Sequence, residues 1–133
     1  DQLIAGYVMV NDLGTVDEFR RADVRWGHDW VSKHQPNFKP AGPFIVPKQF
    51  VDRSRMQIRM KLNGAVMQDW PVTDMIFSPA QLVSRISRDM TLMPGDVICC
   101  GTSVGMLPMK PGSTVEVTVS GVGTLTNIYA PTE

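Results

Sequence analysis

The sequence is poor in the features that define several specialised classes of protein. Its formal net charge is zero, with 13 Lys and Arg residues against 13 Asp and Glu residues spread along the chain. This balance argues against nucleic acid or an anionic membrane as the main partner. No apolar run reaches the roughly 18 residues of a membrane-spanning helix, and we read no signal peptide in the first residues. We therefore expect neither a nucleic-acid partner nor a membrane partner.

Cysteine is also scarce, since the chain has two cysteines and they are the adjacent Cys99 and Cys100. Neighbours in sequence cannot form an ordinary disulfide with each other or make a zinc site alone. This usage suits a reducing cytoplasm, which is the compartment we expect. Neither thiol has a flanking basic residue that would lower its pKa, so we expect both cysteines to be buried rather than reactive.

The residues that are present suffice for one ordinary domain. The chain has 133 residues, of which 43% are hydrophobic, and a chain of this size buries roughly two-thirds of its unfolded surface. The first apolar run, residues 3–10, is typical of a buried strand and starts almost at the first residue. We therefore expect an upstream part to be missing from this chain.

Strand and turn signals dominate the pattern of the chain. Apolar and polar side chains alternate from Met56 to Leu62, and Asn63-Gly64 follows with the residues of a type I′ turn. Residues 55–70 therefore predict a β-hairpin. Valine- and threonine-rich or apolar runs predict further strands at residues 96–100, 114–120 and 123–129.

Two short helices are predicted from capping boxes. Thr15 and Ser78 are each followed by Glu or Gln three residues later, and a proline follows Ser78 directly. The second helix should end near residue 89. Between the helices, residues 26–43 are rich in His, Trp, Asn, Pro and Gly and predict a long ordered loop. The expected fold class is α+β, with six or seven strands.

Asp12 is the first residue that could carry chemistry. It stands at the end of the first predicted strand, just before a helix start, where a carboxylate is well placed to bind a hard metal ion. The alternative is that Asp12 caps a turn. One carboxylate does not make a magnesium site in either case.

Two loops offer further candidates. Lys33 lies in the long loop near His28 and His34, and a lysine in a partly dry loop can neutralise a developing oxyanion. The alternative is a solvated loop lysine. Residues 101–105 (GTSVG) follow a predicted strand and could present backbone amides to an anion, although any strand-to-loop turn can have this composition. Taken singly, none of these features decides the function.

Taken together, the motifs resemble the fumarylacetoacetate hydrolase family. Residues 4–12 match the family pattern I-x-G-Y-x-x-x-N-D, and residues 33–43 match its pattern K-x-x-x-x-F-x-P-x-G-P. The matching segments, in the order of the family, are residues 4–12 (IAGYVMVND), 33–43 (KHQPNFKPAGP), 62–64 (LNG), 68 with 74–78 (Q and DMIFS), 90–98 (MTLMPGDVI), 101–105 (GTSVG), 107–112 (LPMKPG) and 121–125 (GVGTL). They cover nearly the whole chain.

The resemblance implies a β-rich, mixed-sheet fold and a divalent metal, usually Mg²⁺, with Ca²⁺ or Mn²⁺ as variants. Family members act on 2-oxo or 2,4-dioxo acids, most often by hydrolysing a carbon–carbon bond in an acylpyruvate. A metal that chelates the 2-oxo acid would polarise its carbonyl and hold the departing enolate. Members are commonly homodimers. We expect residues 1–133 to be a C-terminal catalytic domain of this kind, truncated on its N-terminal side.

The resemblance also implies roles for individual residues. Asp12 matches the metal-ligand aspartate, and Lys33 matches the active-site lysine that stabilises developing negative charge. Gly101 and Thr102 match the loop that contacts the carboxylate or oxo end of the substrate.

This chain departs from the family pattern at three places. Val16 and Phe19 stand where the family has an arginine and a glutamine. The paired metal glutamates and an acid/base His–Glu pair lie upstream of the aspartate in the family, before this chain begins. The leading hypothesis is therefore a metal-dependent hydrolase, of which this 133-residue chain is a fragment that is inactive alone. The alternatives are a 2-oxo-acid isomerase or decarboxylase, and a catalytically silent member kept for binding or assembly.

Overall fold

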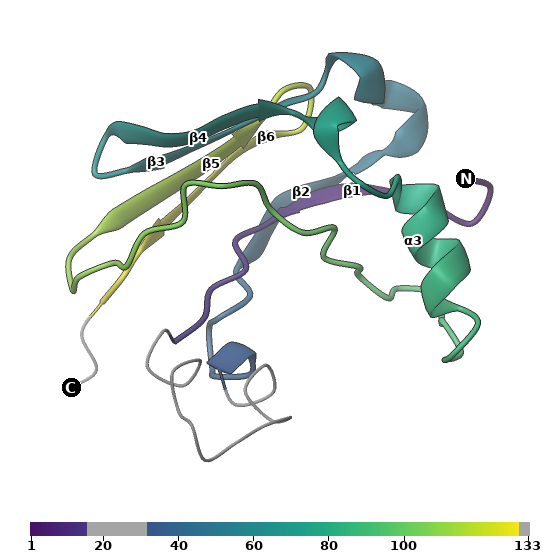
Figure 1. The fold of residues 1–133 in the computed structure, drawn as a ribbon, viewed down its shortest axis with the longest axis horizontal. Helices are drawn as coiled ribbons and strands as arrows, with labels where there is room; N and C mark the ends of the chain where they lie inside the picture. The colour runs from purple at the N-terminus through teal and green to yellow at the C-terminus, as the bar shows by residue number, and fades with distance from the viewer. Residues whose placement is uncertain (16–31, 131–133) are drawn as a thin grey trace.

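The computed structural model describes residues 1–15 and 32–130. Two antiparallel sheets make up the framework (Figure 1). The smaller sheet pairs β1 (Gly6–Val10) with β2 (Ala41–Pro47). The larger sheet has the order β4-β3-β5-β6, formed by β3 (Gln57–Leu62), β4 (Ala65–Pro71), β5 (Thr114–Val119) and β6 (Gly123–Ile128). The β-rich α+β class is confirmed.

The hairpin predicted from the alternating pattern is confirmed. β3 and β4 pair in antiparallel register around a turn in which Asn63 and Gly64 have φ angles of 50° and 83°. These positive values are those a type I′ turn requires. Asn63 also ties the turn to β5, because its Oδ1 accepts a hydrogen bond of 2.9 Å from the backbone N–H of Thr114.

The second predicted helix is confirmed as α3 (Pro79–Ile86). The Ser78 hydroxyl accepts a hydrogen bond from the Gln81 backbone N–H at 3.3 Å, while the Ser78 N–H donates to Gln81 Oε1 at 2.8 Å. The capping box thus satisfies two backbone donors. Three 3-10 turns complete the elements: η1 (Lys48–Phe50), η2 (Arg53–Arg55) and η3 (Val72–Asp74). The helix predicted after Thr15 lies outside the described residues.

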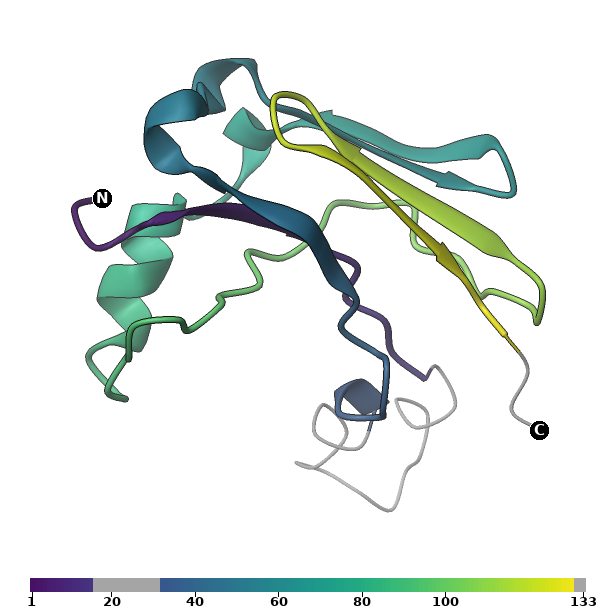
Figure 2. The ribbon, with the colours of Figure 1, turned by 180° about the vertical axis from the view of Figure 1, so that it is seen from behind.

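Two predictions about strands were wrong. Residues 96–100 form no strand, because none of the described strands pairs with this segment. Its one described backbone bond is local, from Asp96 N–H to the Met93 carbonyl at 3.1 Å. β2 (Ala41–Pro47) was missed, because its Pro- and Gly-rich sequence resembles a loop. In both views residues 87–113 run as irregular chain from α3 back to β5 (Figure 2).

A small core joins the two sheets. Met9, Met56, Val119 and Val122 are buried together, and β1 contacts both β5 and β6. Burial of these side chains holds the end of β1 against the larger sheet. Among the described residues, no helix has both the length and the apolar character needed to cross a membrane.

Candidate functional site

Asp12 lies two residues beyond β1, where the pairing of β1 with β2 continues past the ends of both strands. The backbone N–H of Asn11 donates to the Pro40 carbonyl at 3.0 Å, and that of Leu13 donates to the Phe38 carbonyl at 3.0 Å. These flanking bonds place Asp12 opposite Lys39. Its position is therefore fixed by backbone pairing rather than by a free loop.

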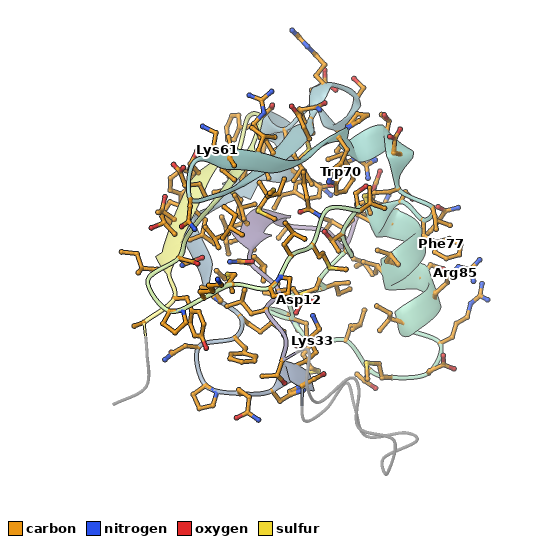
Figure 3. The ribbon with its side chains drawn as sticks, turned by 60° about the vertical axis from the view of Figure 1, so that its left-hand side comes forward. Asp12, Lys33, Lys61, Trp70, Phe77 and Arg85 are labelled. Atoms are coloured by element: carbon orange, nitrogen blue, oxygen red, sulfur yellow. The ribbon has the colours of Figure 1, made fainter. Side chains whose placement is uncertain are left out.

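Lys33 lies against this carboxylate, as the two labelled side chains in Figure 3 show. Its Nζ is 3.2 Å from Asp12 Oδ2 and donates to the Asp12 backbone carbonyl at 3.3 Å. A bond of 3.1 Å from the Thr15 N–H to the Ser32 carbonyl brings the two segments together. The structure thus unites two of the residues that the sequence singled out.

Lys39 is a third member of this group and was missed by the sequence analysis. Its Nζ lies 2.6 Å from Asp12 Oδ1 and donates to the Lys33 carbonyl at 2.9 Å. The register that sets Lys39 opposite Asp12 joins distant segments, and no spacing in the sequence reveals it. A pocket of about 490 Å³, lined by residues between Lys33 and Pro40, opens beside the two lysines.

The two ammonium groups change the ionisation of Asp12. Burial of the carboxyl raises its pKa, but the hydrogen bonds and positive charges of Lys39 and Lys33 outweigh this and hold the pKa below its ordinary value of 3.8. The carboxylate is therefore charged at neutral pH. Because 43% of the Asp12 side chain is exposed, water screens the pair and its contribution to stability is small.

The lowered pKa of Asp12 has a testable consequence. The stability it contributes is present above the unfolded pKa of about 3.8 and is lost as the pH falls through the lower folded pKa. We expect a carboxyl NMR titration of Asp12 to give a pKa below 3.8, and Lys39→Met to raise it. An Asp12 pKa at or above 3.8 in the unmodified protein, or no rise in the variant, would contradict the assigned contacts.

The prediction that both cysteines are buried was wrong, because Cys99 and Cys100 are exposed and form no disulfide. Cys99 also lies close enough to Asp12, Lys33 and Lys39 to feel their charges. Partial desolvation raises the pKa of the Cys99 thiol, and the negative charge of Asp12 raises it further, while Lys39 and Lys33 oppose the shift. The raised pKa keeps the Cys99 thiol protonated and weakly nucleophilic. Low reactivity of this cysteine therefore stays a prediction.

The predicted substrate loop, residues 101–105, is held by β4. The Gln68 side chain on β4 donates to Thr102 Oγ1 at 3.0 Å and to the carbonyls of Ser103 and Val104 at 2.8 and 3.1 Å. Gly101 lies at the exposed start of the loop with a φ of 92°. The described hydrogen bonds of Thr102 go to Gln68 and Ser103, not to the Asp12–Lys33 pair.

The described residues do not by themselves fit a divalent metal ion. Nowhere in residues 1–15 and 32–130 do three His, Cys, Asp or Glu side chains gather closely enough to hold one. Both carboxylate oxygens of Asp12 already contact ammonium groups. Metal sites for Mg²⁺ need several oxygen ligands, and Asp12 can provide one of them.

Comparison with known proteins identifies the family. The family model described as fumarylacetoacetate (FAA) hydrolase C-terminal matches residues 1–128. The chain belongs to the fumarylacetoacetate hydrolase family. The resemblance drawn from the sequence motifs is thereby confirmed.

Relatives in the family carry several activities. A 4-hydroxyphenylacetate degradation bifunctional isomerase/decarboxylase of Salmonella dublin is 35% identical over 95% of this chain and 29% of its own length. A 2,4-didehydro-3-deoxy-L-rhamnonate hydrolase of a Sphingomonas strain is 32% identical over 91% of this chain and 45% of its own length. Family membership alone therefore leaves the reaction open between hydrolysis, isomerisation and decarboxylation.

Solved structures confirm the fold. A 5-carboxymethyl-2-hydroxymuconate delta-isomerase from Mycobacterium smegmatis superposes with a TM-score of 0.89 at 37% identity, covering 99% of this chain and 50% of that one. A maleylpyruvate hydrolase from Sphingobium, solved with manganese(II) and pyruvate, gives 0.86 at 22% identity, covering 99% and 46%; at this identity the likeness shows the fold alone. The chain spans about half the length of the Pyrococcus and mycobacterial relatives that it matches.

Proposed function

We propose that this chain is the catalytic part of a hydrolase that cleaves a carbon–carbon bond in an acylpyruvate-like 2,4-dioxo acid. The observation that carries the proposal is the contact between Asp12 and Lys33, at 3.2 Å, within a chain whose family includes a fumarylacetoacetate hydrolase and a 2,4-didehydro-3-deoxy-L-rhamnonate hydrolase by name. The two residues come from segments 21 positions apart in the sequence. Backbone pairing on both sides of Asp12 keeps its carboxylate in place.

In this proposal Lys33 stabilises the negative charge that develops during cleavage. Hydrolysis joins a water oxygen to the acyl carbon and breaks the carbon–carbon bond, whose electron pair passes to the 2-oxo acid half as an enolate. An ammonium group close to that enolate oxygen lowers the energy of the transition state. Only 26% of the Lys33 side chain is exposed, and partial shielding from water strengthens such an interaction. Thr102 and Gly101 would contact the carboxylate or 2-oxo end of the substrate.

We further propose that Asp12 is one ligand of a divalent metal in the full-length protein, with Mg²⁺ as the expected ion and Ca²⁺ or Mn²⁺ as alternatives. The remaining ligands would come from residues outside the described ones. The support for a metal is the family motif that surrounds Asp12; a maleylpyruvate hydrolase of the same fold was solved with manganese(II). The location that we propose for the protein is the cytoplasm.

A homodimer is proposed as the assembly. Large apolar side chains are exposed, among them Ile76 at 89% and Val104 at 86%, and apolar side chains that gather into one patch would suit such an interface. A monomer mass in light scattering of the full-length protein would contradict the dimer.

A 2-oxo-acid isomerase or decarboxylase is the second candidate. It is favoured by the isomerase/decarboxylase relatives from Salmonella dublin and Escherichia coli, each 35% identical to this chain. The same lysine–carboxylate pair could serve these reactions, because each of them also passes through an enolate of a 2-oxo acid. The nature of the products therefore separates the two candidates.

The deciding experiment is turnover of acetylpyruvate, fumarylpyruvate and oxaloacetate by the full-length protein beside the 133-residue chain, with Mg²⁺, with Mn²⁺ and with a chelator. We expect turnover by the long form only, abolished by the chelator, with pyruvate and a carboxylic acid as products. Release of CO₂ from oxaloacetate, with no turnover of acetylpyruvate or fumarylpyruvate, would favour the decarboxylase. No turnover by either form would favour the catalytically silent alternative, to which Val16 and Phe19, outside the described residues, first pointed.

A further inference from the structure

Gln68 is a buried polar side chain on β4 whose acceptors all belong to one loop. Only 8% of the residue is exposed, and its Nε2 lies within 3.1 Å of Thr102 Oγ1 and of the carbonyls of Ser103 and Val104. A buried amide is tolerated only when it is hydrogen-bonded. One side chain thus ties the turn of this loop to the larger sheet.

The direction of these hydrogen bonds follows from the chemistry of the groups. Carbonyl oxygens only accept, so the group that faces Ser103 and Val104 is the NH₂ of the amide. The two hydrogens of the NH₂ serve three acceptors, so one of them is shared. An amide nitrogen offers no lone pair, so the Thr102 hydroxyl cannot donate to it and can only accept. The hydrogen of the Thr102 hydroxyl is therefore left for another acceptor. The acceptor described for it is the Ser103 carbonyl, at a distance of 3.5 Å. That distance is beyond the ordinary range for a hydroxyl donor.

Thr102 is exposed whereas Gln68 is buried, so the uncommitted hydrogen belongs to a group that a ligand can reach. A hydroxyl that is forced to donate outward suits a carboxylate or carbonyl oxygen. We propose that Gln68 is a positioning residue that holds Thr102 as a hydrogen-bond donor to the carboxylate or 2-oxo oxygen of the substrate. This inference rests on the proposed function and assigns Gln68 to substrate binding rather than to bond cleavage.

A Gln68 variant is expected to fold, because the loop has a second attachment to β4. Gly105 packs directly against the Met67 carbonyl oxygen, in a space that no side chain could enter. Gln57 offers a matched control on the neighbouring strand β3. Its Nε2 donates to Asp69 Oδ1 at 2.7 Å, so Gln57→Met removes an amide donor of the same kind without touching the loop.

The test measures pyruvate binding by calorimetry and the kinetic constants of the full-length protein. We expect Gln68→Met and Thr102→Val each to raise the Kd for pyruvate and the KM about tenfold, the size of one lost hydrogen bond to a charged group, with kcat within about twofold. The double variant should be no worse than the single ones, because both remove the same interaction. Gln57→Met should bind pyruvate like the unmodified protein.

Carbonyl carbon chemical shifts of Ser103 and Val104 provide the readout that does not depend on the ligand, because the Gln68 amide donates to these two carbonyls. We expect Gln68→Met to change both shifts and Thr102→Val to leave them close to those of the unmodified protein. Unchanged pyruvate affinity in Gln68→Met, or effects of the two substitutions that add in full, would overturn the inference while leaving the hydrolase intact. If the unmodified full-length protein binds no pyruvate and turns over no acid of the panel, the proposed function itself fails and the ligand role of Gln68 fails with it.

Discussion

Replacing Lys33 with alanine in the full-length protein is expected to lower kcat for the acylpyruvate substrate about 10²- to 10³-fold, the usual cost of removing one charge-stabilising group from an active site. The fold should survive, because the interactions described for the Lys33 side chain are with Asp12 at the surface. The backbone carbonyl of Lys33, which accepts from Lys39 at 2.9 Å, is kept in the variant. Steady-state kinetics and a urea unfolding curve measure the two effects.

Lys39→Ala is the matched control for this prediction. It also removes an ammonium group from Asp12, in fact the one at the shorter distance, 2.6 Å against 3.2 Å. If Lys33 acts on the substrate, its loss should cost far more turnover than the loss of Lys39. Equal losses in the two variants would mean that both lysines act by holding Asp12, and equal activity of Lys33→Ala and unmodified protein would remove Lys33 from the mechanism.

Local signals predicted the parts of the fold that depend on neighbours in sequence. The turn at Asn63 and Gly64 requires positive φ at both positions, and few residue types other than Asn and Gly favour it. The start of α3 needs a hydroxyl and an amide three residues apart, which Ser78 and Gln81 provide. Such features are decided within four residues, so the sequence reveals them directly.

Elements that depend on a distant partner could not be predicted in this way. β2 (Ala41–Pro47) is a strand because β1 runs beside it, although its prolines and glycine favour a loop. Residues 96–100 have the composition of a strand but lack a partner among the described strands. Strand propensity states only that a segment suits a sheet and not which segment it will pair with.

The same distinction divides the residues of the site. Asp12, Lys33 and Thr102 can be singled out from the sequence because a family motif surrounds each of them, and the structure brings Asp12 and Lys33 into contact. Lys39 cannot be singled out in this way because it reaches Asp12 across a strand register, and the motif that contains Gln68 gives this residue no role. Both act through contacts between segments more than 25 residues apart in the sequence, which only a structure shows.

Replacing Gly105 with alanine is expected to destabilise the full-length protein by about 3–4 kcal/mol, at the upper end for a single substitution. Gly105 has a φ of 103°, where a side chain is strained by about 1–2 kcal/mol. An added Cβ would also collide with the Met67 carbonyl oxygen and lie 3.1 Å from Gln68 Cγ. Backbone atoms cannot swing aside as a flexible side chain can, so the loop must move away from β4.

Gly95→Ala separates the cost of backbone strain from the cost of the collision with the Met67 carbonyl. Its φ of 98° matches that of Gly105, yet nothing lies within 4 Å of the position that its Cβ would occupy. This control should cost only the backbone strain, about 1–2 kcal/mol, and should leave the KM unchanged. Gly105→Ala should raise the KM as well, because the movement takes Thr102 away from the amide of Gln68. Urea unfolding midpoints that fall equally in the two variants would show that the close packing of the loop on β4 contributes nothing, and the hold of β4 on Thr102 would then depend on Gln68 alone.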